Sequence, residues 1–68
     1  MLDFAQHLRS LRIEKNLTQK RLAEITGLTE RGVQKYELGE RKPNFDAIIA
    51  LSKALQISAD VLLGLKEL

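Results

Sequence analysis

The stretch that decides the fold runs from Gln19 to Leu38 and reads QKRLAEITGLTERGVQKYEL. Its apolar spacing predicts two short helices joined by a turn of two or three residues around Gly27. A turn this short makes the helices cross steeply, at about 90–120°. Ala23 supplies the small side chain that the crossing needs, Gly27 the positive φ of the turn, and Val33 fills the angle. The spacing Ala-x3-Gly-x5-Val therefore predicts a tight corner between two helices.

The second helix of this corner, expected over about residues 29–38, has a polar outer face. Arg31, Gln34 and Lys35 are long, polar and at helical spacing, whereas Val33 and Tyr36 are expected to pack inward. A helix about 10–12 Å across fits a DNA major groove about 12 Å wide. Similar corners also occur in proteins that never touch DNA, so the spacing alone leaves the function open.

Short helices are predicted along the whole chain. Five segments each open with a residue that can cap a helix, followed by apolar residues at helical spacing; the caps are Asp3, Thr18, Thr29, Asn44 and Ser58. In the fourth segment Phe45, Ile48, Leu51 and Leu55 are expected on one buried side. No segment alternates with a period of two. The sequence predicts an all-α, compact bundle of about five short helices, forming a single domain over residues 1–68.

The amino-acid composition argues against several classes of function. The 68 residues are 44% hydrophobic, which suits one small folded domain. With no cysteine and one histidine, we expect no metal and no cofactor. The longest apolar run, residues 47–51, is far shorter than the roughly 20 residues that span a bilayer, and the N-terminus lacks a signal-peptide pattern. We expect a soluble cytoplasmic protein, without a membrane partner, that is not an enzyme.

The charge is uneven along the chain. The whole sequence carries a formal net charge of +2, with 11 Lys or Arg against 9 Asp or Glu. Residues 1–42 have a net charge of +3, and residues 43–68 a net charge of −1. A polyanion is therefore expected to bind to the first two thirds of the chain, where the positive charge lies.

Residues along almost the whole chain match one family pattern. They are Leu11-Arg12, Leu17-Thr18-Gln19, Leu22-Ala23, Gly27-Leu28-Thr29, residues 33–39, Pro43, Leu51, residues 55–58 and Leu62-Leu63. Through these residues the chain resembles the helix-turn-helix domains of the Cro and phage-repressor type, often called the Xre family, over about residues 4–64. The resemblance implies a lambda-repressor-like DNA-binding domain.

The resemblance also implies a function and partners. It implies sequence-specific binding of double-stranded DNA by a transcriptional regulator, expected to be a repressor, with the helix of about residues 29–38 in the major groove. Such domains usually pair as homodimers on palindromic operators whose half-sites lie about 34–36 Å apart.

The roles that the resemblance implies fall into three groups. Contacts with DNA phosphates are implied for Thr18, Gln19, Thr29, Arg41, Lys42 and Asn44. Positions that approach base edges are Glu30, Arg31, Gln34 and Lys35. Arg12 and Glu37 match a partly buried ion pair that ties the first helix to the end of the third.

Side-chain chemistry adds detail to the base contacts. Arg31 can grip guanine O6 and N7, Gln34 can pair with adenine, and Lys35 can reach a guanine or a phosphate. Glu30 can accept from cytosine N4 or favour the helix N-terminus through the dipole. Gly32 stands where the family usually has Ser or Thr; it costs roughly 1 kcal/mol of helix propensity and could admit a close approach of backbone to DNA.

The remaining residues of interest have ordinary structural explanations. His7 is expected to be an exposed helix residue. In the last helix Val61, Leu62 and Leu65 are expected to face inward, and Leu65 with Leu68 either completes the core or forms a dimer seam.

An alternative function is a helix-turn-helix fold that serves as a protein-interaction module without binding DNA. The low net charge and the acidic Glu30 and Glu40 favour this alternative. The basic excess before Pro43 and the expected phosphate contact of Gln19 oppose it.

Overall fold

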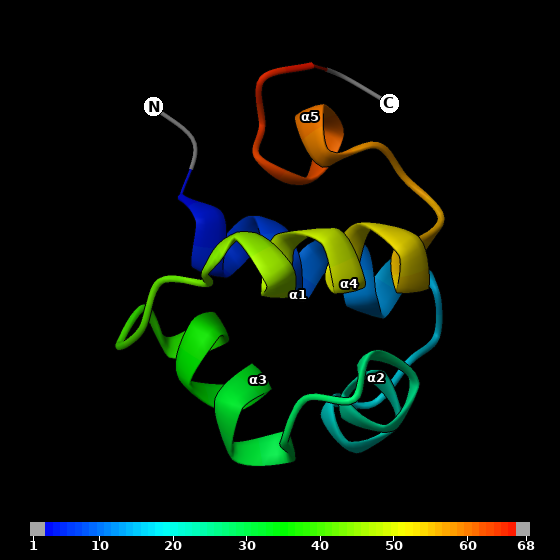
Figure 1. The fold of residues 1–68 in the computed structure, drawn as a ribbon, viewed down its shortest axis with the longest axis vertical. Helices are drawn as coiled ribbons and strands as arrows, with labels where there is room; N and C mark the ends of the chain where they lie inside the picture. Colours follow the sequence, from blue (N-terminus) through cyan, green and yellow to red (C-terminus); the bar gives the residue numbers. More distant parts are fainter. Residues whose placement is uncertain (1–2, 67–68) are drawn as a thin grey trace.

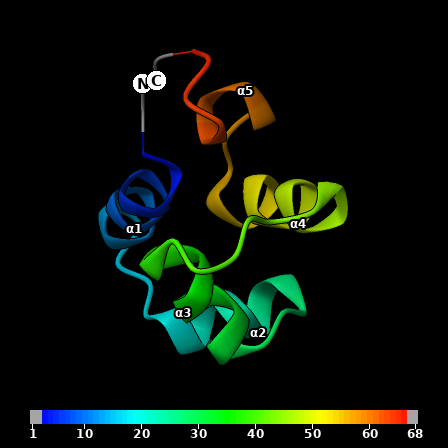
Figure 2. The same cartoon turned by 90° about the vertical axis from the view of Figure 1, so that its left-hand side faces the viewer.

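A computed structural model describes residues 3–66, and all its regular elements are helices. They are α1 (Phe4–Glu14), α2 (Gln19–Thr26), α3 (Glu30–Leu38), α4 (Phe45–Leu55) and α5 (Ala59–Leu62). In two perpendicular views α1 and α4 occupy the middle of the molecule, with α2 and α3 on one side and α5 on the other (Figures 1 and 2). The predicted all-α bundle of five short helices is confirmed.

Each helix begins at the predicted cap. The side-chain oxygens of the five cap residues accept a hydrogen bond from a backbone N–H in the first turn, with Asp3, Thr18, Thr29, Asn44 and Ser58 as the caps. These bonds satisfy N–H groups that have no partner within the helix. Local sequence therefore sets where each helix starts.

Glycines end the two helices of the corner. Gly27 follows α2 with a φ of 78°, and Gly39 follows α3 with a φ of 76°. A side chain disfavours this left-handed conformation, so glycine is the residue that fits it best. The turn at Gly27 lets α3 leave α2 in a new direction after two further residues.

Replacing Gly27 by alanine is expected to lower the free energy of unfolding by about 1–2 kcal/mol. A Cβ at Gly27 would meet no atom within 4 Å, so the loss comes from backbone strain and involves no clash. Urea denaturation followed by circular dichroism measures it. The control is Gln6→Ala on the exposed side of α1; equal effects of the two changes would contradict the assignment.

Every helix contributes to the core. The largest fully buried side chains are Leu8, Leu22, Val33, Leu51, Leu55 and Leu62. Tyr36 is also buried, as predicted. No helix among residues 3–66 is long and apolar enough to cross a membrane.

Two sequence predictions about burial, those for Phe45 and His7, are wrong, and the structure decides against one alternative for Leu65. Phe45 is 77% exposed, because a side chain at the first position of a helix leans past the helix end, beyond the packed turns. Leu65 is 76% exposed, since α5 ends at Leu62 and Leu65 lies beyond its inward face, so it does not complete the core and the dimer seam stays a prediction. His7 is half-buried, and its Nε2 lies 2.8 Å from the carbonyl oxygen of Val61, which links α1 to α5. Leu68 lies outside the described residues.

Candidate nucleic-acid interface

The corner between α2 and α3 is packed around two small apolar residues. Ala23 and Val33 are both buried, on α2 and α3 respectively. With Val33 and Tyr36 facing the core, the opposite side of α3 faces outward. The exposed residues of that side include Glu30, Arg31 and Gln34.

An ion pair joins the end of α3 to α1. Arg12 donates from Nε to Glu37 Oε2 at 2.6 Å and from Nη2 to Glu37 Oε1 at 2.9 Å. Arg12 also donates from Nη1 to the carbonyl oxygen of Leu17 at 2.7 Å. The two side chains are 11% and 3% exposed, so the ion pair expected from the resemblance is present and largely shielded from water.

The contact with Glu37 favours the charged form of Arg12. Its hydrogen bond with Glu37 raises the pKa of the guanidinium above the ordinary value, burial opposes this, and the Glu37 charge adds to the rise. A raised pKa stabilises the fold below the ordinary value, and that stability is lost only as the pH rises through the folded-state pKa. Arginine is already fully charged near neutral pH, so Arg12 gives the domain no pH switch there.

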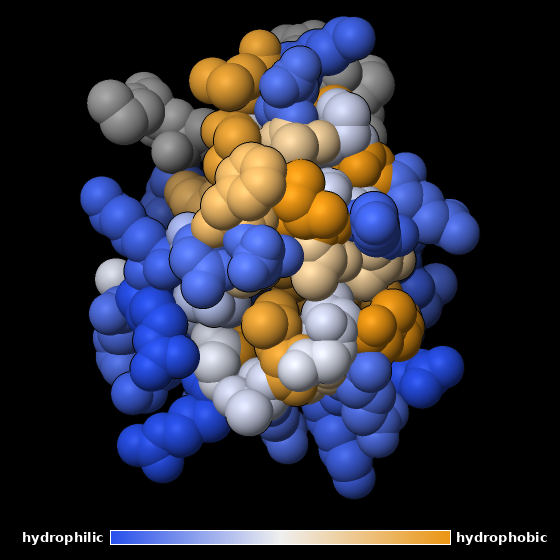
Figure 3. All heavy atoms as spheres, in the orientation of Figure 1, coloured by the Kyte–Doolittle hydropathy of each residue, from blue (hydrophilic) through white to orange (hydrophobic). Residues whose placement is uncertain are grey.

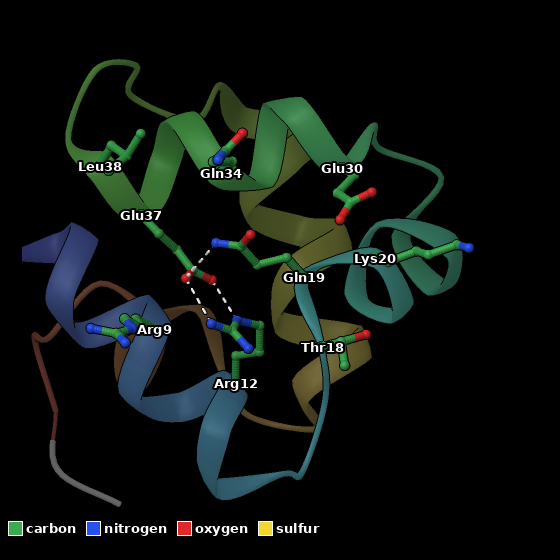
Figure 4. Close-up of a pocket in the computed structure, with 9 residues that line it drawn as sticks. All are labelled: Arg9, Arg12, Thr18, Gln19, Lys20, Glu30, Gln34, Glu37 and Leu38. Carbon is green, nitrogen blue, oxygen red and sulfur yellow. Dashed lines mark hydrogen bonds and ion pairs between the residues drawn. The ribbon is translucent and has the colours of Figure 1, made fainter.

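Gln19 belongs to the same network. Its Nε2 donates to Glu37 Oε1 at 3.1 Å, so one carboxylate holds side chains from α1 and α2 (Figure 4). The amide nitrogen carries two hydrogens, and the bond to Glu37 uses one of them. Gln19 is thus fixed in place with a second N–H available for a ligand.

A cleft of about 570 Å³ opens beside this network. It lies between α1, α2 and α3, and its lining residues are Arg9, Arg12, Thr18, Gln19, Lys20, Glu30, Gln34, Glu37 and Leu38 (Figure 4). Besides the Arg12–Glu37 pair, the cleft brings together four residues predicted to contact DNA: Thr18, Gln19, Glu30 and Gln34.

Sequence reasoning missed two cations of this cleft, Arg9 and Lys20. Their side chains extend outward from two different sides of it (Figure 4). Arg9 precedes Arg12 by three residues and so shares its helix face, and Lys20 directly follows Gln19. That spacing was a signal that could have identified both.

The remaining predicted residues lie outside the cleft. Arg31, Arg41 and Lys42 are exposed, and Lys35 is half-buried. Arg31 and Lys35 are four residues apart and therefore form a second row on α3, beside the row of Glu30 and Gln34. The outer side of α3 thus carries an acidic and amide row facing the cleft and a basic row away from it.

The capping residues keep donors for a ligand. Thr18 Oγ1 accepts from the backbone N–H of Arg21, Thr29 Oγ1 from that of Gly32, and Asn44 Oδ1 from that of Ala47. A hydroxyl or amide that accepts at a cap still has its own hydrogen to donate.

The suggestion that Gly32 opens the backbone to DNA is wrong. Gly32 is buried, and a Cβ there would lie 3.0 Å from Thr29 Oγ1 and 4.0 Å from Arg41 Nη1. Protein atoms already occupy this space. The tight contact is with Thr29 Oγ1, which accepts the cap hydrogen bond from the Gly32 N–H, whereas Arg41 Nη1 stands at an ordinary contact distance.

A buried corner that presents one polar helix to solvent defines a helix-turn-helix domain. The chain belongs to the helix-turn-helix family, of the Cro and phage-repressor type, whose sequence model matches residues 8–62.

Three known proteins illustrate the similarity. The HTH-type transcriptional regulator YqaE of Bacillus subtilis is 38% identical over 60 residues, covering 88% of this chain and 52% of YqaE. The crystal structure of the restriction-modification controller protein C.AhdI from Aeromonas hydrophila has a TM-score of 0.86 and 38% identity, with 88% and 91% of the chains covered. The c2 repressor of Salmonella phage P22, in complex with a synthetic operator, has a TM-score of 0.85 and 31% identity, with 91% and 94% covered. The chain spans about half the length of YqaE and of YonR, a second HTH-type regulator of Bacillus subtilis that it matches.

Proposed function

We propose that this chain binds double-stranded DNA sequence-specifically as the DNA-binding domain of a transcriptional regulator, with α3 in the major groove. The observation that carries this proposal is the outward polar face of α3, held clear of the core by the corner at Gly27. The similarity to the P22 c2 repressor in complex with an operator supports it and favours it over a protein-interaction module.

Positive charge flanks α3 on two sides. Arg9 and Lys20 project from the cleft side, and Arg41 and Lys42 lie on the connection between α3 and α4. The two backbones that border a major groove carry regularly spaced phosphates, so a reading helix needs donors on both flanks. The cations and the Gln19 amide are the donors that we assign to phosphates, together with Thr18, Thr29 and Asn44.

Base contacts are assigned to the outer side of α3. Arg31 is exposed and suits guanine O6 and N7, and Gln34 suits adenine N6 and N7. The half-buried stem of Lys35 packs on the protein while its ammonium reaches outward to a guanine or a phosphate. Glu30 is the assigned acceptor for cytosine N4, and its carboxylate disfavours a base that presents only acceptors at that point.

We propose that the chain meets DNA in the cytoplasm. We propose a repressor that binds a palindromic operator as a homodimer, with half-sites about 34–36 Å apart. Selection of bound sites from a random duplex pool tests this, because it returns the sequence, its symmetry and the half-site spacing together. A selected pool without a shared motif would refute sequence-specific binding.

Arg31→Ala is expected to cost roughly 1–3 kcal/mol of binding free energy on the preferred site and to relax the preference at one base pair of each half-site. Fluorescence anisotropy on the selected duplex and on its single-base variants measures both effects. The control is Lys66→Ala. Lys66 is exposed and follows α5, a helix that lies on the other side of the molecule from α3 (Figure 1). An unchanged base preference in the Arg31 variant would show that Arg31 does not read a base.

A further inference from the structure

The outer face of α4 is apolar at its centre and charged beside it. We give this name to Phe45, Asp46, Ile49, Ala50, Lys53 and Ala54, which with Ile25 and Thr26 of α2 line a groove of about 590 Å³. Phe45 is 77% exposed and Ile25 45% exposed. Apolar side chains gather over α4 on this side, whereas the lower margin, over α2 and α3, is largely hydrophilic (Figure 3).

Apart from Ala54, which packs partly against the core, this face lies away from the core and from the proposed DNA contacts. The opposite side of α4 is buried through Ile48, Leu51 and Leu55. No residue of the outer face is assigned to a base or a phosphate. In Figure 2 α4 lies at the edge of the molecule, and among residues 3–66 no other helix covers its outer side.

The outer face is complementary to itself. If a second α4 packs antiparallel with a two-fold axis between Ile49 and Ala50, each residue meets a fixed partner residue. Asp46 and Lys53 are seven residues apart, about two helical turns, and therefore lie along one line of the outer face. The two-fold axis brings Asp46 opposite Lys53 of the other copy, with the apolar Ile49 and Ala50 between the two charge pairs, so the charges of the two copies match.

We propose that two copies of this chain pair through the outer faces of their α4 helices about this axis. A two-fold interface uses the same patch on both copies, which requires the self-complementarity that the sequence of α4 supplies. Phe45 is the anchor, because a large exposed aromatic side chain that enters a groove on its partner contributes most to such an interface.

The pairing deepens the proposed function, since it names the interface of the homodimer proposed on DNA. None of Arg31, Gln34 and Gln19 lines the groove at the outer face of α4. Self-association is measured without DNA, so its failure leaves the test of DNA binding unaffected.

Charge exchange tests the pairing sharply. Asp46→Lys and Lys53→Asp each put two like-charged contacts into the dimer and are expected to weaken self-association about 10-fold or more. The double variant Asp46→Lys/Lys53→Asp restores opposite charges and is expected to return to within about 3-fold of the unmodified chain. Sedimentation equilibrium of the whole 68-residue chain over a concentration series measures these constants.

Three further variants complete the test. Phe45→Ala is expected to weaken pairing about 10-fold or more without unfolding the chain, because Phe45 is exposed. Glu14→Lys is the matched charge reversal on the end of α1 and is expected to leave pairing unchanged, with circular dichroism as the check on folding. Leu65→Asp probes the alternative interface after α5.

Clear results would overturn the proposal. One is a chain that stays monomeric up to roughly 1 mM, a concentration at which even weak specific pairs form. Others are a dimer that Leu65→Asp disrupts but the α4 variants do not, or a double variant as weak as the single ones.

Discussion

Glu37→Ala is expected to lower the free energy of unfolding by about 3–5 kcal/mol, because it leaves the shielded Arg12 guanidinium without its partner charge. Glu37 is 3% exposed on its side chain and accepts three hydrogen bonds, two from Arg12 and one from Gln19. Domains of this size are typically stable by only about 0.05–0.15 kcal/mol per residue. The variant should therefore be largely unfolded at temperatures where the unmodified chain is folded.

A second ion pair of the same chain provides the control. Arg21 Nη1 lies 3.4 Å from Glu24 Oε1, and the two side chains are 61% and 54% exposed. Arg21→Ala is expected to change stability by less than about 1 kcal/mol, since water already solvates that pair. Thermal unfolding followed by circular dichroism compares the two variants. Equal losses would mean that the Arg12–Glu37 pair adds no more than a surface contact.

Affinity for DNA is expected to fall steeply with salt. If Arg9, Lys20, Arg41 and Lys42 of two copies each neutralise one phosphate, the slope of log K against log salt is about −7, and affinity drops about 10⁴-fold between 50 and 200 mM salt. Anisotropy titrations of a random duplex at several salt concentrations measure the slope. An interaction module without DNA binding would show no such dependence.

Two variants separate charge from hydrogen bonding in this dependence. Lys42→Ala should reduce the slope by about 2 in a dimer, because one cation is lost from each copy. Gln19→Ala should weaken binding to all sequences alike and leave the slope unchanged, since a neutral amide releases no counterion. A Lys42 variant with an unaltered slope would place the connection after α3 away from the DNA backbone.

The helices themselves could be predicted from local signals. A cap such as Thr18 or Thr29 acts on N–H groups two or three residues away, and Gly27 acts through its own φ, so neighbouring residues carry the information. The small Ala23 and the apolar Val33 followed from the same short-range spacing.

Side-chain partners from distant segments were harder to predict. The link from His7 to Val61 spans 54 positions, and the bond from Gln19 to Glu37 spans 18. Such pairs depend on how whole helices pack, which periodicity does not encode. Phe45 shows the same limit, because its spacing matched the buried row while its place at the first turn left it exposed.

The candidate site was predicted unevenly for the same reason. The resemblance marked Thr18, Gln19, Glu30 and Gln34, and the structure gathers these four around one cleft. Arg9 and Lys20 were not predicted as site residues, because the residues that match the family pattern do not include them. Their place beside Gln19 becomes evident once α1 and α2 are seen together (Figure 4).

The residues that attach α3 to the rest of the protein are different from the residues that face outward from it. Val33, Tyr36 and Glu37 anchor the helix, while Arg31 and Gln34 are exposed. New outward side chains could therefore be exchanged without disturbing the scaffold beneath. Relatives built on one framework can in this way diverge in the genes they govern while folding alike.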